Sequence, residues 1–326
     1  MTDIYKKFIE KVGIPVKEQE PLAQYSTYKV GGPADLFIEA RSVEDIVMAV
    51  ATARSFAIPF IILGGGSNIL IGDKGFRGLV IRNLTKTIVV RGMKGAISKG
   101  ISDGSVYIEA ESGVSFNALV RYSIEESLGG IEMHLGLPGT VGGAIYMNSK
   151  WMKTKSFVGD AVYQATILTP DGTVKKVAND YFHFSYGAST IQKTGDIILS
   201  VIFALKRADK ETLWKTANES MEYRKSTQPQ GVKTAGCVFK NISLTEAAIA
   251  GTPNHTTSTG YLIDKSGCKS IAVGGAAVSQ IHANFIVNTG SATAADMVQL
   301  IETIRGKVKE KFNITLVEEI KRIGEF

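Results

Sequence analysis

Apolar and polar residues follow two different spacings along the chain, and these spacings predict its helices and strands. Apolar residues at helical spacing predict helices over 42–55, 115–130 and about 293–312, and a polar helix is expected over 206–226. Two of these segments open with the pattern of a capping box, in which a hydroxyl residue stands three positions before an acidic one: Ser42 with Asp45, and Thr293 with Asp296.

Short apolar runs bounded by glycine, proline or asparagine predict the β-strands. They cover 58–63, 69–71, 79–83, a hairpin over 161–177, 197–205 and about 314–324. The run 197–205 is the most apolar of them, and we expect it at the centre of a sheet. Helix and strands alternate in the first part of the chain, which therefore is expected to be an α/β structure.

The glycines of the chain are clustered, and the clusters suggest a binding site. Glycine accounts for 34 of 326 residues, and one cluster, GGGSN at 64–68, lies between two apolar runs. It is neither a dinucleotide fingerprint, because Ile69 stands where that pattern needs glycine, nor a P-loop, because no Gly-Lys-Ser/Thr follows. Consecutive glycines can present backbone N–H groups to an anion, and Ser67 and Asn68 add side-chain donors.

A second glycine cluster, GLPGTVGGAIYMN, occupies 136–148. Each cluster, taken alone, is equally well explained as a tight turn. Two phosphate-binding loops together would suit a ligand with a diphosphate, such as a flavin or nicotinamide dinucleotide. The residues themselves leave these two interpretations open.

Charge, cysteine and histidine exclude several classes of protein. The 37 basic and 31 acidic residues give a net charge of +6 without a basic cluster, so we expect no nucleic-acid partner. Cys237 and Cys268 cannot form a disulfide framework, and the four histidines lack metal-ligand spacing, so no metal site is expected. No signal peptide is recognisable and no apolar stretch approaches the roughly 20 residues that span a bilayer, which predicts a cytoplasmic protein without membrane contact.

Seven segments, in order and at sensible spacing, resemble the UDP-N-acetylenolpyruvoylglucosamine reductase family, and within it the shorter subgroup. They are YSTYKVGGPADLFIEA (25–40), ILGGGSNILIGDKGFRGLVIRN (62–83), GLPGTVGGAIYMN (136–148), RKSTQP (224–229), AGCVFKN (235–241), YLIDKSGCKSIAVGGAAVSQIHANFIVN (261–288) and EEIKRIG (318–324). The resemblance runs from about residue 20 to the end of the chain.

This resemblance implies an α+β fold, with a vanillyl-alcohol-oxidase-like FAD-binding region of two α/β subdomains and a C-terminal α+β substrate-binding domain. We expect the first FAD-binding subdomain over 1–82, joined by the C-terminal strand at about 315–326. The second is expected over 83–208, and the substrate-binding domain over 209–314.

The resemblance also implies the reaction. In this family FAD is reduced by NADPH and passes hydride to UDP-N-acetylglucosamine enolpyruvate, which gives UDP-N-acetylmuramate for peptidoglycan synthesis. Many related flavin oxidases carry a histidine near the first glycine loop for covalent attachment, and none lies within 60–80 here, so noncovalent FAD is expected. We expect the protein to act as a monomer.

Binding residues follow from the same match. Those implied for the cofactor are Tyr28, Lys29, Gly64, Gly65, Gly66, Ser67, Asn68, Gly136, Pro138, Gly139, Thr140, Gly142, Gly143 and Ala144. Those implied for the substrate are Tyr186, Arg224, Gln228, Lys240 and Asn241. An arginine fork such as that of Arg224 suits a diphosphate or a carboxylate.

Three catalytic positions are implied, and two of them depart from the family. Cys237 stands where the family has a proton-donating serine, and Glu319 matches a glutamate that polarises the enolate-like species. Glu318 beside it illustrates the alternative of a surface carboxylate. Gly187 stands where the family has an arginine, in the frame Phe-Ser-Tyr-Gly-Ala-Ser, and the loss of this cation predicts slow turnover unless Lys150 replaces it.

Two other interpretations stay open. One is a different FAD-linked oxidase or dehydrogenase of the same fold. The other is a flavin- or UDP-sugar-binding homologue in which catalysis is weakened, for which Gly187 is the sequence feature.

Overall fold

The computed structural model describes residues 3–94, 97–98, 101–102, 104–151 and 153–326. The chain forms two compact units that are each built from several segments. The first unit comprises residues 1–17, 37–65 and 79–224, and the second comprises 18–36, 66–78 and 225–326. The division passes within three strands, β1 (Val16–Pro21), β2 (Pro33–Ala40) and β5 (Phe76–Asn83).

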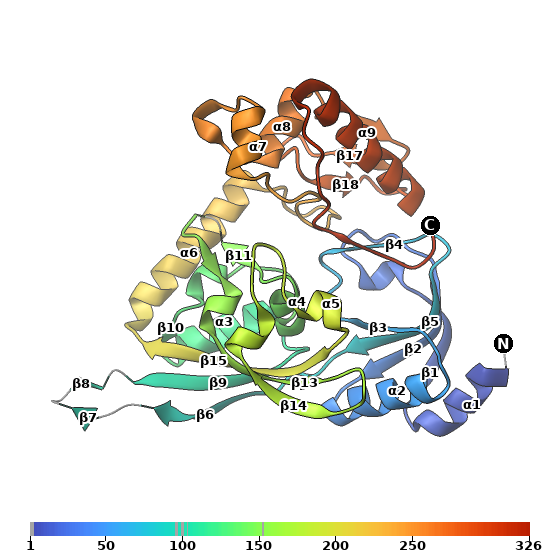
Figure 1. Ribbon diagram of the computed structural model, residues 1–326, viewed down its shortest axis with the longest axis vertical. Coiled ribbons are helices and arrows are strands. Elements are labelled where there is room, and N and C mark those ends of the chain that lie inside the picture. Colours follow the sequence, from blue (N-terminus) through green and yellow to red (C-terminus); the bar gives the residue numbers. More distant parts are fainter. Residues whose placement is uncertain (1–2, 95–96, 99–100, 103, 152) are drawn as a thin grey trace. The chain divides into compact units, whose positions relative to one another are not determined.

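A four-stranded sheet has the order β1-β2-β5-β3, with β3 at Phe60–Leu63. Strands β3 and β5 are parallel, and Phe60 lies opposite Leu79 in the first unit. Helix α2 (Val43–Ser55) has the predicted capping box, since Ser42 Oγ accepts from Asp45 N at 3.1 Å and Asp45 accepts from the Ser42 N–H. Helix α1 (Asp3–Val12), for which the sequence pattern gave no prediction, lies beside α2 (Figure 1).

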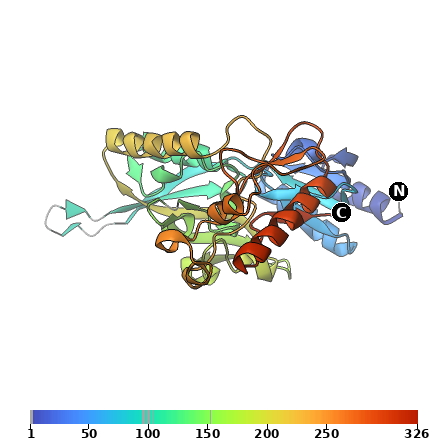
Figure 2. The same cartoon turned by 90° about the horizontal axis from the view of Figure 1, so that it is seen from above.

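The larger sheet of the first unit contains the apolar run 197–205, which the sequence predicted to lie at the centre of a sheet. Strand β15 (Ile197–Arg207) lies between β13 and β9 in the order β14-β13-β15-β9-β6, which confirms that prediction. The other members are β6 (Ile88–Lys94), β9 (Ser105–Glu111), β13 (Val162–Leu168), β14 (Val174–Ala178) and β10 (Leu128–Gly129), which pairs with β15. Strands β6 and β9 are antiparallel, with Lys94 opposite Ser105, and lie at the edge of the sheet that is seen from above in Figure 2. The predicted hairpin over 161–177 is confirmed as β13 and β14.

Three helices bury the core against one face of this sheet: α3 (Phe116–Glu125), α4 (Val141–Tyr146) and α6 (Lys210–Thr227). The predicted helix over 115–130 is wrong at its end, because Ser127 adopts a left-handed φ of 58° and Leu128 then pairs with Arg207. The glycines of the second cluster were expected to form a loop, whereas Gly142 and Gly143 belong to α4. Shorter elements complete the unit: β7 (Ile97–Ser98), β8 (Ile101–Ser102), β11 (Lys150–Trp151), β12 (Ser156–Phe157) and α5 (Ile191–Thr194).

The second unit packs its helices on a small antiparallel sheet. Its helices are α7 (Leu244–Ile249), α8 (Thr259–Lys265) and α9 (Ala294–Phe312), and its sheet is β16 (Ala272–Val273), β17 (Ala276–Val278) and β18 (Ile286–Asn288). The capping box of α9 is confirmed at Thr293 and Asp296. The predicted strand over 314–324 shortens to β19 (Lys321–Ile323), which pairs in parallel with β4 (Ile69–Ile71).

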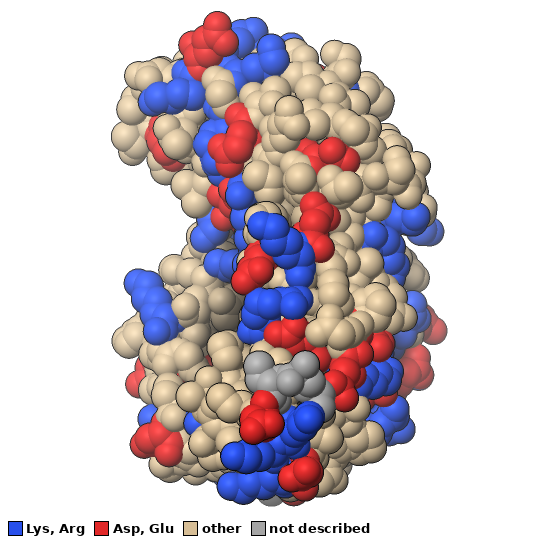
Figure 3. All heavy atoms as spheres, turned by 90° about the vertical axis from the view of Figure 1, so that its right-hand side faces the viewer, with Lys and Arg blue, Asp and Glu red and all other residues tan. Residues whose placement is uncertain are grey.

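Charges of both signs lie side by side on the face shown in Figure 3, as expected from their mixed order in the sequence. Within the described residues, no helix combines the length and the apolar character that crossing a membrane requires.

Candidate active site

The two glycine clusters meet in the first unit at Gly64 and Gly65. A Cβ at Gly65 would lie 2.8 Å from Gly139 Cα, and one at Gly64 would lie 2.5 Å from Thr140 Oγ1. Side chains at these positions would force the loops apart, so glycine here permits direct backbone packing. Gly65, Pro138 and Gly143 are exposed, which leaves a surface lined by backbone at this junction. Such a cradle fits a diphosphate group, and the residues present are therefore compatible with FAD.

Several amides of the second glycine cluster are already engaged within the protein. Gly136 N donates to Asn117 Oδ1 at 2.6 Å, Gly142 N to the Ser112 carbonyl at 2.8 Å, and Gly143 N to Thr140 Oγ1 at 3.4 Å. Hydrogen bonds of this kind fix the loop that leads into α4. These glycines thus shape the cradle, and their contact with a cofactor stays a prediction, as it does for Ala144 on α4.

The remainder of the first glycine loop lies in the second unit. Gly66 has a φ of 63°, and a Cβ there would lie 2.0 Å from the Tyr25 carbonyl oxygen, so this position requires glycine. Asn68 Nδ2 donates to the Glu319 carbonyl at 3.1 Å, and Lys321 N donates to the Asn68 carbonyl at 2.9 Å. The Asn68 amide, predicted as a cofactor donor together with Ser67, therefore also holds the segment that carries Glu319.

Tyr28 and Lys29, predicted near the flavin, have opposite environments. Tyr28 is 1% exposed within the core of the second unit, and burial raises the pKa of its phenol, with the charges of Cys237 and Glu318 acting in the same direction. Lys29 is exposed, and its Nζ donates to the Gln24 carbonyl at 2.7 Å. The phenol of Tyr28 thus lies close to the predicted proton donor Cys237.

Cys237 is half-buried. It lies on an extended segment of the second unit, between two other backbone segments of that unit. On one side Cys237 forms a β-bridge with Phe285, and Val238 N donates to the Asn284 carbonyl at 2.8 Å. On the other side Glu319 N donates to the Val238 carbonyl at 2.7 Å. The structure therefore brings together the backbones that carry Cys237 and Glu319, although 82 positions separate them in the sequence (319 − 237 = 82).

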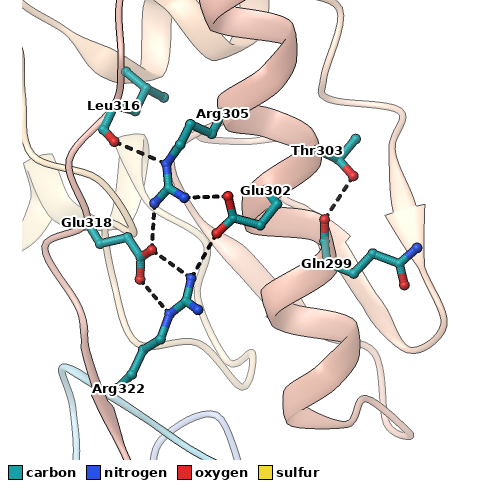
Figure 4. A network of polar contacts seen from close by, with 7 residues as sticks. All are labelled: Gln299, Glu302, Thr303, Arg305, Leu316, Glu318 and Arg322. Carbon is teal, nitrogen blue, oxygen red and sulfur yellow. Dashed lines mark hydrogen bonds and ion pairs between the residues drawn. The ribbon is translucent and has the colours of Figure 1, made fainter. Parts of the chain in front are cut away.

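Glu318 and Glu319 differ in their surroundings, and Figure 4 shows those of Glu318. Glu318 Oε1 lies 2.6 Å from Arg305 Nη2 and 2.7 Å from Arg322 Nη2, and Glu302 on α9 closes the network with contacts to both arginines. Glu318 therefore anchors the C-terminal segment to α9. Glu319 instead acts on Lys321: burial and the charge of Lys240 lower the pKa of Lys321, and Glu319 opposes them.

Lys321 is a candidate functional residue that the sequence analysis did not select. It is a half-buried cation near both Lys240 and Glu319. Its position two residues after Glu319, in a segment already matched to the family, was the available signal. Of the other substrate-site predictions in this unit, Asn241 Oδ1 accepts from Thr259 N at 3.3 Å at the start of α8, and the Gln228 carbonyl accepts from Gln230 Nε2 at 3.1 Å.

Gly187 lies in a tight turn of the first unit. Ser185 N donates to the Ala188 carbonyl at 3.1 Å, Ala188 N donates back at 3.2 Å, and Gly187 is buried with a φ of 62°. This left-handed conformation favours glycine, so the absence of an arginine here has a backbone cause.

Strand β11 contacts two of the predicted substrate residues. Lys150 Nζ lies 3.6 Å from the centre of the Tyr186 ring, and the Trp151 ring lies 4.6 Å from the Arg224 guanidinium carbon. Arg224 also packs against the second glycine cluster, because a Cβ at Gly136 would lie 2.9 Å from its Cδ. The sequence left Lys150 without a location, and the structure places it beside Tyr186.

Comparison with known proteins agrees with the cradle and the C-terminal segments. The sequence model of an FAD binding domain matches residues 34–178, and that of the UDP-N-acetylenolpyruvoylglucosamine reductase C-terminal domain matches residues 228–323. The UDP-N-acetylenolpyruvoylglucosamine reductase of Halalkalibacterium halodurans is 35% identical over 95% of each chain, and that of Bacillus subtilis is 32% identical over 99% of each. The crystal structure of UDP-N-acetylenolpyruvylglucosamine reductase from Thermus caldophilus matches with a TM-score of 0.73 at 30% identity, over 95% of this chain and 98% of that chain.

Proposed function

The chain belongs to the UDP-N-acetylenolpyruvoylglucosamine reductase family, and from that premise we propose that it reduces UDP-N-acetylglucosamine enolpyruvate to UDP-N-acetylmuramate. NADPH is the proposed electron donor. The protein is proposed to act in the cytoplasm as a monomer, and its product is proposed to be used in peptidoglycan synthesis. The observation that carries the proposal is the hydrogen bond of 2.7 Å from Glu319 N to the Val238 carbonyl, which brings the segments of Cys237 and Glu319 together.

FAD is the proposed cofactor, held noncovalently. The backbone of Gly64, Gly65 and Gly139 would lie against its diphosphate, and Ser67 is proposed as a further cofactor-binding residue. When bound, FAD would supply hydride-transfer chemistry between NADPH and the enolpyruvyl double bond. The close packing of Gly65 on Gly139 supports this assignment, because it leaves the backbone of both loops accessible.

Cys237 is proposed to deliver the proton that completes the reduction. A cysteine thiol is a stronger acid than a serine hydroxyl, so it suits the role of a proton donor. Cys237 is half-buried on a segment fixed on both sides by backbone hydrogen bonds, which limits where its thiol can lie. Glu319 is proposed to polarise the species that precedes protonation, and its charge acts to raise the pKa of Lys321.

Two of the residues proposed for the substrate, Tyr186 and Arg224, belong to the first unit. The other three, Gln228, Lys240 and Asn241, belong to the second. Arg224 suits the diphosphate of the UDP moiety, since its guanidinium offers a planar fork of donors. The Trp151 ring under that guanidinium restricts its motion.

A spectroscopic titration under anaerobic conditions tests the proposal. Adding NADPH is expected to bleach the absorbance of bound flavin, and adding UDP-N-acetylglucosamine enolpyruvate is expected to restore it while UDP-N-acetylmuramate forms. Acid precipitation should then release a yellow supernatant. Protein that takes up no FAD would refute the cofactor, yellow colour retained in the pellet would refute noncovalent binding, and bleaching without recovery would refute the substrate.

A second candidate function is a flavin- and UDP-sugar-binding homologue with weakened catalysis. The buried, left-handed Gly187 favours it, because this position carries no charge. Its signature in the same titration is normal bleaching by NADPH and a slow but measurable recovery on addition of the UDP-sugar.

A further inference from the structure

The reaction proposed above requires a positive charge near the enolpyruvyl carboxylate. Negative charge builds on that side of the substrate during reduction, and a cation held in advance stabilises it. The turn Ser185–Ala188 contains Tyr186, which is proposed to contact the substrate, and carries no cation of its own. Gly187 also cannot be exchanged for a charged residue without strain, because its φ is 62°.

A cation reaches this turn from another part of the first unit. Lys150 Nζ lies 3.6 Å from the centre of the Tyr186 ring, a distance typical of a close cation–π contact. A lysine ammonium carries a full positive charge and three N–H donors, so it can contact a ring face and an anion at the same time. Lys150 is half-buried, which strengthens its attraction to a carboxylate relative to a fully solvated lysine.

The backbone around Lys150 is tied to the same turn. Asn148 Nδ2 donates to the Ser185 carbonyl at 3.0 Å, and Asn148 Oδ1 accepts from Gly159 N at 3.0 Å. Ser149 accepts from Val158 N at 2.8 Å, and Lys150 pairs with Phe157 in the β11–β12 hairpin. These contacts fix the backbone segment from which the side chain of Lys150 reaches Tyr186.

The neighbouring residue gives the hairpin a second contact with the predicted substrate site. Trp151 is 5% exposed, and its ring lies under the guanidinium of Arg224. One two-residue strand thus supports Arg224, suited to the diphosphate, and supplies a separate cation at Tyr186. These two separate cations match a substrate with two separate anionic groups, the diphosphate and the enolpyruvyl carboxylate.

We propose that Lys150 is a catalytic residue that binds the enolpyruvyl carboxylate and stabilises its developing negative charge, in the place that Gly187 leaves without a cation. The inference rests on the proposed function and adds a residue to it. With this residue, the proposed reaction does not depend on a cation in the turn itself.

The test compares Lys150→Met, which keeps an unbranched side chain without the charge, with Lys150→Arg, which keeps the charge. Lys155→Met on the same hairpin is the matched control, since Lys155 is exposed. Both half-reactions are followed by anaerobic stopped-flow absorbance. Lys150→Met is expected to leave flavin reduction by NADPH within about twofold and to slow reoxidation by the UDP-sugar by about 10²–10³-fold. Lys150→Arg should recover most of that loss, and Lys155→Met should match the parent protein.

A binding measurement separates a charge effect from a structural one. UDP-N-acetylmuramate carries the carboxylate, and UDP-N-acetylglucosamine lacks it. Lys150→Met is expected to weaken calorimetric binding of the first at least tenfold and to leave the second unchanged. Equal weakening of both ligands, or reoxidation at the parent rate in a folded, FAD-loaded Lys150→Met protein, overturns the inference. Failure of the parent protein itself to reoxidise with the UDP-sugar would instead refute the proposed function.

Discussion

The backbone N–H of Glu319 donates a hydrogen bond of 2.7 Å to the carbonyl of Val238. This bond and the β-bridge between Phe239 and Glu318 hold the C-terminal segment beside the segment of Cys237. Lys240 N extends the pairing with a hydrogen bond of 2.8 Å to the Val317 carbonyl. The proton donor and the carboxylate proposed for one half-reaction are therefore fixed to each other through their backbones.

Replacing Cys237 should slow one half-reaction and leave the other nearly unchanged. Cys237→Ala removes the proposed proton donor and should leave flavin reduction by NADPH within about twofold, while reoxidation by the UDP-sugar falls by about 10²–10⁴-fold. Cys237→Ser keeps a hydroxyl donor and should retain activity. Anaerobic stopped-flow absorbance measures both steps, and an equal loss in the two half-reactions of the alanine variant would show that Cys237 has another role.

Glu319 and Glu318 should respond in opposite ways to the same substitution. Glu319→Gln is expected to slow reoxidation by about 10²–10³-fold and to leave the melting temperature nearly unchanged. Glu318→Gln weakens the network with Arg305 and Arg322 and should reduce the free energy of unfolding by about 1–2 kcal/mol, between values typical of exposed and buried ion pairs. Reoxidation should then stay within about threefold of the parent. The reverse pattern would assign the catalytic carboxylate to Glu318.

Restoring an arginine at position 187 should not accelerate this enzyme. Gly187→Arg must adopt a φ near 62°, and this left-handed conformation should reduce the free energy of unfolding by about 1–2 kcal/mol. Gly187→Ala carries the same backbone cost without the charge and serves as the control. Because Lys150 already provides a cation, the arginine should help only in the Lys150→Met background. A tenfold faster reoxidation of Gly187→Arg in the parent background would contradict this account.

Local signals in the sequence predicted the parts of the fold that depend on neighbouring residues. The capping boxes at Ser42 and Thr293 were correct because each involves only four consecutive residues. The end of α3 was missed because pairing of Leu128 with Arg207, 79 positions away (207 − 128 = 79), competes with the helix. The long strand predicted over 314–324 was wrong because only Lys321–Ile323 finds a continuous partner, in β4.

The candidate site, too, could be predicted from the sequence only in part. Motif order identified Cys237, Glu319 and the glycine clusters, whose roles in binding and catalysis stay predictions. It could not locate Lys150, because its partner Tyr186 is 36 positions away (186 − 150 = 36) on a different turn. Nor could it show that the Asn68 amide is engaged with the Glu319 carbonyl. Contacts of this kind depend on the tertiary structure and leave no periodic signal in the chain.

Acidification should destabilise the first unit through His134. This residue is fully buried, with Nε2 3.2 Å from Ser156 Oγ, and burial together with the nearby Arg224 charge lowers the pKa of its imidazole to about 4. An unfolded histidine titrates near 6.5, so between pH 6.5 and about 4 only the unfolded state takes up this proton. The stability that this group contributes is complete above pH 6.5 and is lost as the pH falls toward 4, by roughly 3 kcal/mol in all.

Urea unfolding between pH 4.5 and 7.5, followed by tryptophan fluorescence, measures this slope, because Trp151 and Trp214 both belong to the first unit. His134→Gln should flatten the pH dependence of the unfolding free energy, whatever its effect on stability at pH 7.5. Arg224→Gln should reduce the slope in part, since it removes the second cause of the shift. His183→Gln replaces an exposed histidine of the same unit and is the control. A slope that His183→Gln removes and His134→Gln retains would show that His134 is not the group responsible.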